Sequence, residues 1–214
     1  GALIDPIKEK MAVSDHTLVL KKWLRVPPSA DVAPLARINK MIDLKTGDKY
    51  RLLVHDLRGK IFELADDSAT VFFDVKSQLP NFMDRPGLAS GLGSFTFHPD
   101  YESNGLMYTV HTEPDSTGLA DFALPSGIKV AVQYVLTEWK NNSLTATNFI
   151  PASRRELLRI DMNTVIHGVQ DIQFNPLVKK GNPDYGMLYI GVGDGGVALA
   201  GHPELADNIK HIWS

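Results

Sequence analysis

The sequence has no cysteine, which excludes disulfide bonds and thiolate metal sites. It also has no apolar run approaching the roughly 20 residues of a membrane-spanning helix. Basic residues are not in excess, because 22 Lys and Arg stand against 25 Asp and Glu, for a net charge of −3. That balance gives no electrostatic reason to expect binding to nucleic acid or to an anionic membrane.

The composition is that of an ordinary globular protein. Hydrophobic residues make up 43% of the 214 residues and charged residues 22%, which is enough for one sizeable core or two small ones. We treat residues 1–214 as a single domain. Residues 1–15 are polar and predict an N-terminal arm.

Short apolar runs separated by turn residues dominate the chain from residue 49 onward. Runs of strand length occupy 50–57, 60–64, 71–75, 95–98, 106–111, 154–160, 167–176 and 186–196. Residues 128–139 form a longer candidate, because apolar residues alternate there at period two. Residues 16–26 are apolar and rich in β-branched side chains, and they predict a further strand ending at two prolines.

Many short strands with few helical stretches predict an antiparallel all-β fold. A sandwich, a barrel and a β-propeller all fit this pattern. Since a propeller blade takes roughly 40–50 residues, the chain has room for at most about four or five blades, and fewer once its long loops are subtracted.

Three ordered blocks carry a more specific signal. Residues 51–64 contain Arg-Leu-Leu-Val and Arg-Gly-Lys-Ile-Phe-Glu-Leu. Residues 91–108 contain Gly-Leu-Gly-Ser-Phe-Thr-Phe-His-Pro-Asp-Tyr and Asn-Gly-Leu-Met-Tyr. Residues 167–196 contain His-Gly-Val-Gln-Asp-Ile-Gln-Phe-Asn-Pro and Leu-Tyr-Ile-Gly-Val-Gly-Asp-Gly-Gly. This ordered set resembles the PQQ-dependent soluble aldose dehydrogenases, also called glucose/sorbosone dehydrogenases.

The resemblance implies a fold and an activity. The family forms six-bladed β-propellers, so this chain is expected to be an incomplete propeller of about three to four blades, the N-terminal portion of a longer protein and inactive alone. The implied reaction oxidises an aldose at its anomeric carbon, with hydride transfer to PQQ. Calcium binds beside PQQ in the family, through ligands expected mostly beyond residue 214, so no metal ligand is assigned here. The resemblance also implies a periplasmic or secreted protein, and it leaves the electron acceptor open.

His167 is the predicted catalytic residue. In the resembled family this histidine is the general base, and imidazole suits that task because its pKa lies near the working pH. A histidine that is merely satisfied at a strand end is the alternative. The resemblance also implies an aspartate just before the histidine to orient it, but here that position is Ile166, which cannot hydrogen-bond. Asp171 is a candidate to take over this role.

Four further residues are predicted to contact the cofactor. Asp194, Gly195 and Gly196 end an apolar run, and in the family this turn lies beside PQQ, where glycine lets a flat ring approach the backbone. A tight turn between strands is the alternative. Ala89 stands where the family often carries a Gln or Glu that contacts the cofactor.

The remaining polar residues show no metal-binding spacing such as His-x-His or His-Glu-x-x-His. The acidic residues of the loop at 113–127, Glu113, Asp115 and Asp121, are predicted to be solvated. His98 is predicted to be structural.

Two other functions stay open. One is a catalytically silent propeller that binds a sugar or a protein, which Ile166 and Ala89 favour. The other is a six-bladed metal-dependent lactone hydrolase, against which the missing acidic ligands argue.

Overall fold

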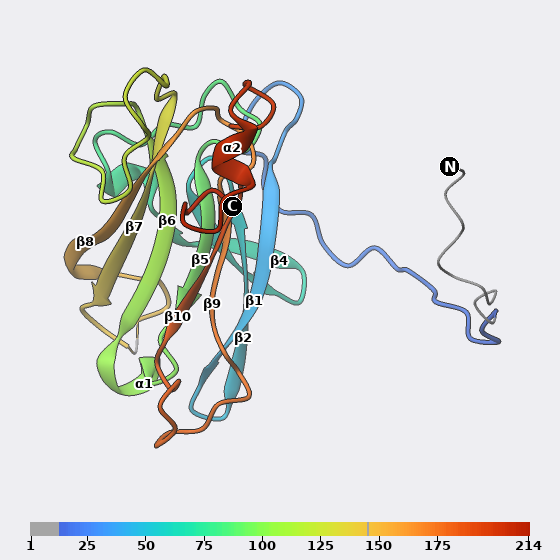
Figure 1. Cartoon of the computed structure of the whole chain (residues 1–214). Helices are drawn as coiled ribbons and strands as arrows, with labels where there is room; N and C mark the ends of the chain where they lie inside the picture. The colour runs from blue at the N-terminus through green and yellow to red at the C-terminus, as the bar shows by residue number, and fades with distance from the viewer. Residues whose placement is uncertain (1–12, 145) are drawn as a thin grey trace.

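Antiparallel strands make up most of the regular structure of the chain (Figure 1). The computed structural model describes residues 13–144 and 146–214, so most of the predicted N-terminal arm lies outside the described residues. The first sheet contains β1 (Ile38–Thr46), β2 (Lys49–Asp56), β3 (Lys60–Ala65) and β4 (Ser68–Asp74). The second contains β5 (Leu92–Phe97), β6 (Leu106–Glu113), β7 (Val132–Asn141) and β8 (Pro151–Met162). A hairpin of β9 (Val169–Phe174) and β10 (Leu188–Val192) follows.

Each sheet is built from strands that are consecutive in sequence, and every neighbouring pair is antiparallel. Helical structure is limited to three single turns in the described residues: a 3₁₀ turn at Lys76–Gln78, α1 (Tyr101–Asn104) and α2 (Pro203–Ala206). The predicted antiparallel all-β fold is therefore confirmed.

Side-chain alternation gives the second sheet two buried faces. On β6, Met107 joins one apolar cluster, whereas Tyr108 and Val110 join another. This follows from the period of two along a strand, which sends successive side chains to opposite faces. The second sheet is therefore the shared wall of two cores.

The first core joins the two four-stranded sheets, and includes Leu53, Phe73, Phe95 and Trp139. The second core joins the second sheet to the hairpin and the C-terminal segment, and includes Tyr134, Ile160, Ile172 and Trp213. Strand β5 contacts both β1 and β9. The first strands of the three sheets thus lie in succession, and the start of β9 is held against the second sheet.

The prediction of a strand at residues 16–26 is wrong. This segment forms no ladder with any described residue, and Figure 1 shows it leading away from the sheets toward the N-terminus. Leu18 and Leu20 are 92% and 96% exposed. Trp23 donates its indole N–H to the Asp66 carbonyl at 2.8 Å. An apolar, β-branched composition favours a strand only where a partner strand and a packing face are available.

Candidate functional site

His167 lies immediately before β9 in an unusual backbone conformation. Its φ angle is +53°, in the left-handed region that few residues other than glycine adopt. Its side chain is 61% exposed. Such conformations cost energy and persist only where the surroundings enforce them, often at functional sites.

Asp194 is the hydrogen-bond partner of His167. Their Nδ1 and Oδ1 atoms are 3.0 Å apart, and Oδ1 also accepts the backbone N–H of Gly196 at 3.0 Å. The antiparallel pairing of β9 with β10 explains the contact, because it brings the start of β9 to the end of β10. A carboxylate only accepts hydrogen bonds, so this contact assigns the imidazole proton to Nδ1 and leaves the lone pair on Nε2.

Backbone contacts fix the His167 segment against the turn that follows β10. The Gly195 N–H donates to the His167 carbonyl at 2.9 Å, and the Gly193 N–H donates to the Gly168 carbonyl at 3.2 Å. A Cβ at residue 193 would lie 2.2 Å from the His167 carbonyl oxygen. Only glycine at this position allows so close an approach.

Packing within the chain accounts for the two glycines after Asp194. Gly195 and Gly196 are buried, with φ angles of +59° and +73°. A Cβ at Gly195 would lie 2.4 Å from the Met162 sulfur, and one at Gly196 would lie 2.4 Å from Thr164 Oγ1. Their contact with a cofactor stays a prediction.

Ala89 lies in the turn before β5 and is linked to the His167 strand. Its carbonyl accepts hydrogen bonds from Tyr134 Oη and from Gln170 Nε2, both at 3.1 Å. Gln170 belongs to β9, three residues after His167. The structure therefore connects the Ala89 turn, one of the two turns predicted to contact the cofactor, to β9, the strand that follows His167.

Asp171 does not orient the His167 ring, so that sequence-based expectation is wrong. Its carboxylate pairs with Lys40 Nζ at 2.5 Å, because alternation along β9 directs it toward β1 and β5. The carboxylate that reaches the ring is Asp194, which the sequence placed only in the cofactor turn. A prediction that the apolar runs at 167–176 and 186–196 pair as a hairpin would have identified Asp194 as this carboxylate.

A second histidine–carboxylate pair lies buried on β6 and contacts Arg159 of β8. His111 Nε2 and Glu113 Oε1 are 3.1 Å apart, and Arg159 donates to Glu113 Oε2 at 2.9 Å. These side chains are only 1%, 8% and 5% exposed, respectively. The hydrogen bond from His111, together with the Arg159 guanidinium, lowers the pKa of Glu113 to about 2. Burial lowers the pKa of His111.

This cluster corrects the prediction of solvated acidic residues at one position, Glu113, which is buried at the end of β6. Asp115 and Asp121 are exposed as predicted, although Asp121 accepts the backbone N–H of Arg159 at 2.8 Å. Glu113 and Asp121 both contact Arg159 on β8, which is 46 and 38 residues away in sequence. Such long-range pairing leaves no local signal.

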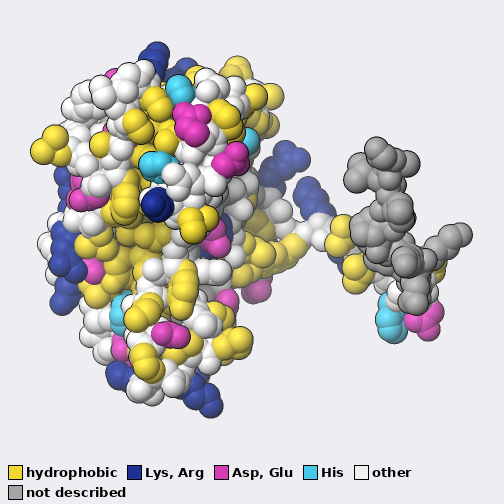
Figure 2. Space-filling view, in the orientation of Figure 1, with side chains coloured by type: hydrophobic (Ala, Val, Ile, Leu, Met, Phe, Trp, Pro, Cys, Tyr) yellow, Lys and Arg dark blue, Asp and Glu magenta, His cyan; other side chains and the backbone are white. Residues whose placement is uncertain are grey.

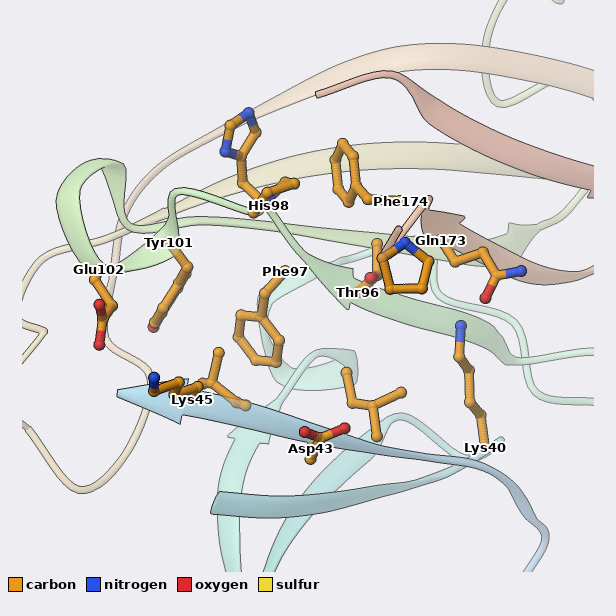
Figure 3. Close-up of a pocket in the computed structure, with 14 residues that line it drawn as sticks. Lys40, Asp43, Lys45, Thr96, Phe97, His98, Tyr101, Glu102, Gln173 and Phe174 are labelled. Atoms are coloured by element: carbon orange, nitrogen blue, oxygen red, sulfur yellow. The ribbon is translucent and has the colours of Figure 1, made fainter. Parts of the chain in front are cut away.

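A cleft of about 390 Å³ opens at the other end of β9, between β1 and β5 (Figure 3). Lys40, Asp43 and Lys45 line it from β1, opposite Phe97 and Phe174 among others. His98, also at its edge, accepts the Asp100 backbone N–H on Nδ1 at 2.9 Å. This contact agrees with a structural role. His167 does not line this cleft.

In Figure 2, histidine and acidic side chains gather on the upper part of the face shown, above a band of apolar side chains.

The described residues contain no group of three or more His, Cys, Asp or Glu arranged to hold a metal ion. Within the same residues, no helix has the length and apolar character needed to cross a membrane.

Comparison with known proteins finds a similar fold among solved structures. Neither protein-family models nor curated proteins give a match to this sequence. Among solved structures, the chain is similar to the PQQ-bound form of aldose sugar dehydrogenase from Streptomyces coelicolor, with a TM-score of 0.52 and 20% identity over 89% of this chain and 45% of that chain. It is also similar to a protein from Thermus thermophilus assigned as an oxidoreductase (glucose dehydrogenase), with a TM-score of 0.46 and 14% identity over 72% of this chain and 40% of that chain.

The match to the Streptomyces structure confirms, at the level of structure, the resemblance seen in the three sequence blocks. At 20% identity it establishes a shared fold. The chain spans less than half the length of either solved structure.

Proposed function

We propose that this chain is part of a PQQ-dependent aldose dehydrogenase. In this proposal the two four-stranded sheets are successive propeller blades, and β9 and β10 begin a third. The consecutive antiparallel strand order supports this assignment, as does the fold shared with an aldose sugar dehydrogenase. The remaining blades, most of the cofactor contacts and the calcium ligands belong to the part of the protein beyond this chain.

The contact between His167 and Asp194 carries the proposal. The imidazole is exposed, its Nδ1 is engaged by Asp194 at 3.0 Å, and its Nε2 keeps the lone pair. This is the tautomer a general base requires. The sequence-based objection was that Ile166 cannot orient the ring. Because Asp194 supplies the orienting carboxylate, that objection to an enzyme no longer holds.

The residues present fit one side of a quinone-cofactor site. Asp194 keeps a side chain that is 26% exposed beside His167, and the Ala89 turn is hydrogen-bonded to Gln170 of β9. When bound, PQQ supplies the electron acceptor that the chain's own residues lack. His167 Nε2 accepts the proton of the sugar's anomeric hydroxyl, and Asp194 stabilises the resulting imidazolium. By resemblance to the family, we place this reaction in the periplasm or outside the cell.

The test uses the protein that carries this chain, loaded with PQQ and calcium and mixed with a saturating aldose. We expect His167→Ala to slow PQQ reduction by about 10²-fold, the lower part of the range for a positioned general base, with cofactor occupancy unchanged. His202→Ala is the matched control, because His202 also pairs with a carboxylate, that of Glu204 at 3.5 Å, outside the candidate site.

Two outcomes would overturn the proposal. One is a wild-type protein that reduces no PQQ with any aldose. The other is a His167→Ala variant as fast as wild type. Either result would favour the catalytically silent binding module.

A further inference from the structure

We infer that Tyr134 is a positioning residue, whose hydroxyl holds the turn at residues 87–91 against the strand that carries His167. The part of this inference that concerns PQQ binding rests on the proposed function. The structural part rests on contacts among three segments that are distant in sequence: the Ala89 turn, β7 and β9.

The contacts converge on one carbonyl oxygen. The Ala89 carbonyl accepts from Tyr134 Oη and from Gln170 Nε2, each at 3.1 Å. Gln170 Nε2 also lies 3.3 Å from Tyr134 Oη. The two side chains thus form a small triangle with the carbonyl, at the edge of the second core.

The protonation state of Tyr134 fixes the direction of its hydrogen bond. Its side chain is almost fully buried, and burial raises its pKa to about 12. The phenol therefore keeps its proton throughout the physiological range. Because a carbonyl oxygen only accepts, Tyr134 must be the donor to Ala89.

The ring of Tyr134 also touches the other side of the candidate site. A Cβ at Gly168 would lie 2.2 Å from two carbon atoms of this ring and 2.5 Å from its hydroxyl oxygen. Gly168 directly follows His167, so the ring packs on the peptide that leads from the base into β9. One side chain therefore contacts both the peptide that follows His167 and the turn that contains Ala89.

Arg37 also holds the same turn. Its guanidinium donates to the carbonyls of Leu88, Ser90 and Asp84, the last two at 2.9 and 3.2 Å. The turn therefore keeps several anchors when the Tyr134 hydroxyl is removed. A variant lacking only that hydroxyl should fold, and its effect should be local.

The experiment compares Tyr134→Phe with wild type by amide hydrogen exchange, without cofactor or sugar. The substitution keeps the ring against Gly168 and removes the donor. Since a hydrogen bond contributes about 1 kcal/mol, we expect exchange at Ser90 and Gly91 to accelerate about fivefold. Both amides are hydrogen-bonded in the structure, to the Gly87 carbonyl and to Thr112 Oγ1. Exchange in the centres of β6 and β7 should stay as in wild type.

Tyr108→Phe is the matched control. Tyr108 is a buried tyrosine in the neighbouring strand β6, and its hydroxyl donates to Glu138 at 2.9 Å, away from the turn. It should leave exchange at Ser90 and Gly91 unchanged. Unchanged exchange in Tyr134→Phe, a uniform rise across the sheet, or an equal effect of Tyr108→Phe would overturn the inference and mark Tyr134 as ordinary core packing.

A titration with PQQ and calcium separates this inference from the proposed function. We expect Tyr134→Phe to weaken PQQ binding about fivefold, from the same hydrogen bond, and to leave the rate at saturating PQQ within about twofold of wild type. Accelerated exchange with unchanged PQQ affinity would show that the Tyr134 hydroxyl holds the turn but does not support PQQ binding. A wild type that binds no PQQ would overturn the proposed function, while the exchange result would still decide the structural part.

Discussion

Two histidine–carboxylate pairs in this chain use the same chemistry in opposite surroundings. His111 and Glu113 are buried beside Arg159, whereas His167 is 61% exposed at the end of a hairpin. The buried pair has a third charged partner and lies under packed side chains. The exposed pair has one carboxylate and a strained backbone. The difference indicates that the first pair stabilises the fold and that the second is available for chemistry.

The largest expected effect comes from breaking the buried cluster. Arg159→Ala removes the partner of Glu113 and leaves a buried carboxylate beside a histidine. We expect the free energy of unfolding to fall by about 3–5 kcal/mol, as for other broken buried ion pairs, measured by urea denaturation. Arg155→Ala is the control, because Arg155 also pairs with a glutamate but is 69% exposed, and we expect a loss below about 1 kcal/mol. Equal losses would remove the distinction between the two surroundings.

A crossed pair of histidine variants sharpens the comparison. His111→Ala leaves a cavity and an unpaired Glu113 oxygen, so we expect the free energy of unfolding to fall by about 2–3 kcal/mol. His167→Ala alters an exposed side chain and should change it by no more than about 0.5 kcal/mol. Thermal and urea unfolding of both variants test this expectation. A His167→Ala variant as unstable as His111→Ala would show that the exposed pair is also structural.

Acid should weaken the buried pair. The pKa of Glu113 is lowered from 4.5 to about 2 in the folded protein, so its ionised form contributes stability above pH 4.5 that is lost as the pH falls toward 2. Burial lowers the pKa of His111, which acts in the same direction as the pH falls below its ordinary value. We expect Glu113 to contribute of the order of 2 kcal/mol to this loss.

Urea denaturation at successive pH values measures that dependence. Glu113→Gln should flatten the curve between pH 4.5 and about 2. Glu204→Gln, on α2, is the control and should leave the curve as in wild type. A Glu113→Gln curve parallel to that of wild type would count against the pairing.

The smallest expected effect concerns the partner of His167. Asp194→Asn keeps the size of the side chain but removes the charge that favours a proton on Nδ1. We expect PQQ reduction to slow by about tenfold, equivalent to one orienting hydrogen bond, with the free energy of unfolding nearly unchanged. Stopped-flow reduction with cofactor occupancy checked is the measurement. A fully active Asp194→Asn variant would mean that the ring needs no orienting carboxylate.

The sequence by itself determined the strand content and the position of the exposed histidine. Alternating apolar runs and turn residues are local features, so they predicted most strands from residue 49 onward and their antiparallel class. They failed at residues 16–26, because a strand also needs a partner, which composition does not supply. They also placed the start of the strand at 128–139 too early, since β7 begins at Val132.

Only the tertiary structure decided which side chains meet. Asp194 reaches His167 because β9 and β10 pair in one register, and Asp171 turns to Lys40 because alternation sends it to the other side. Glu113 and Arg159 are 46 residues apart, and Tyr134 and Ala89 are 45 apart. Contacts over such separations depend on how sheets pack and on strand register, where a shift of one residue reverses every side chain. Local sequence patterns predict most of the strands, whereas long-range packing determines which side chains contact each other.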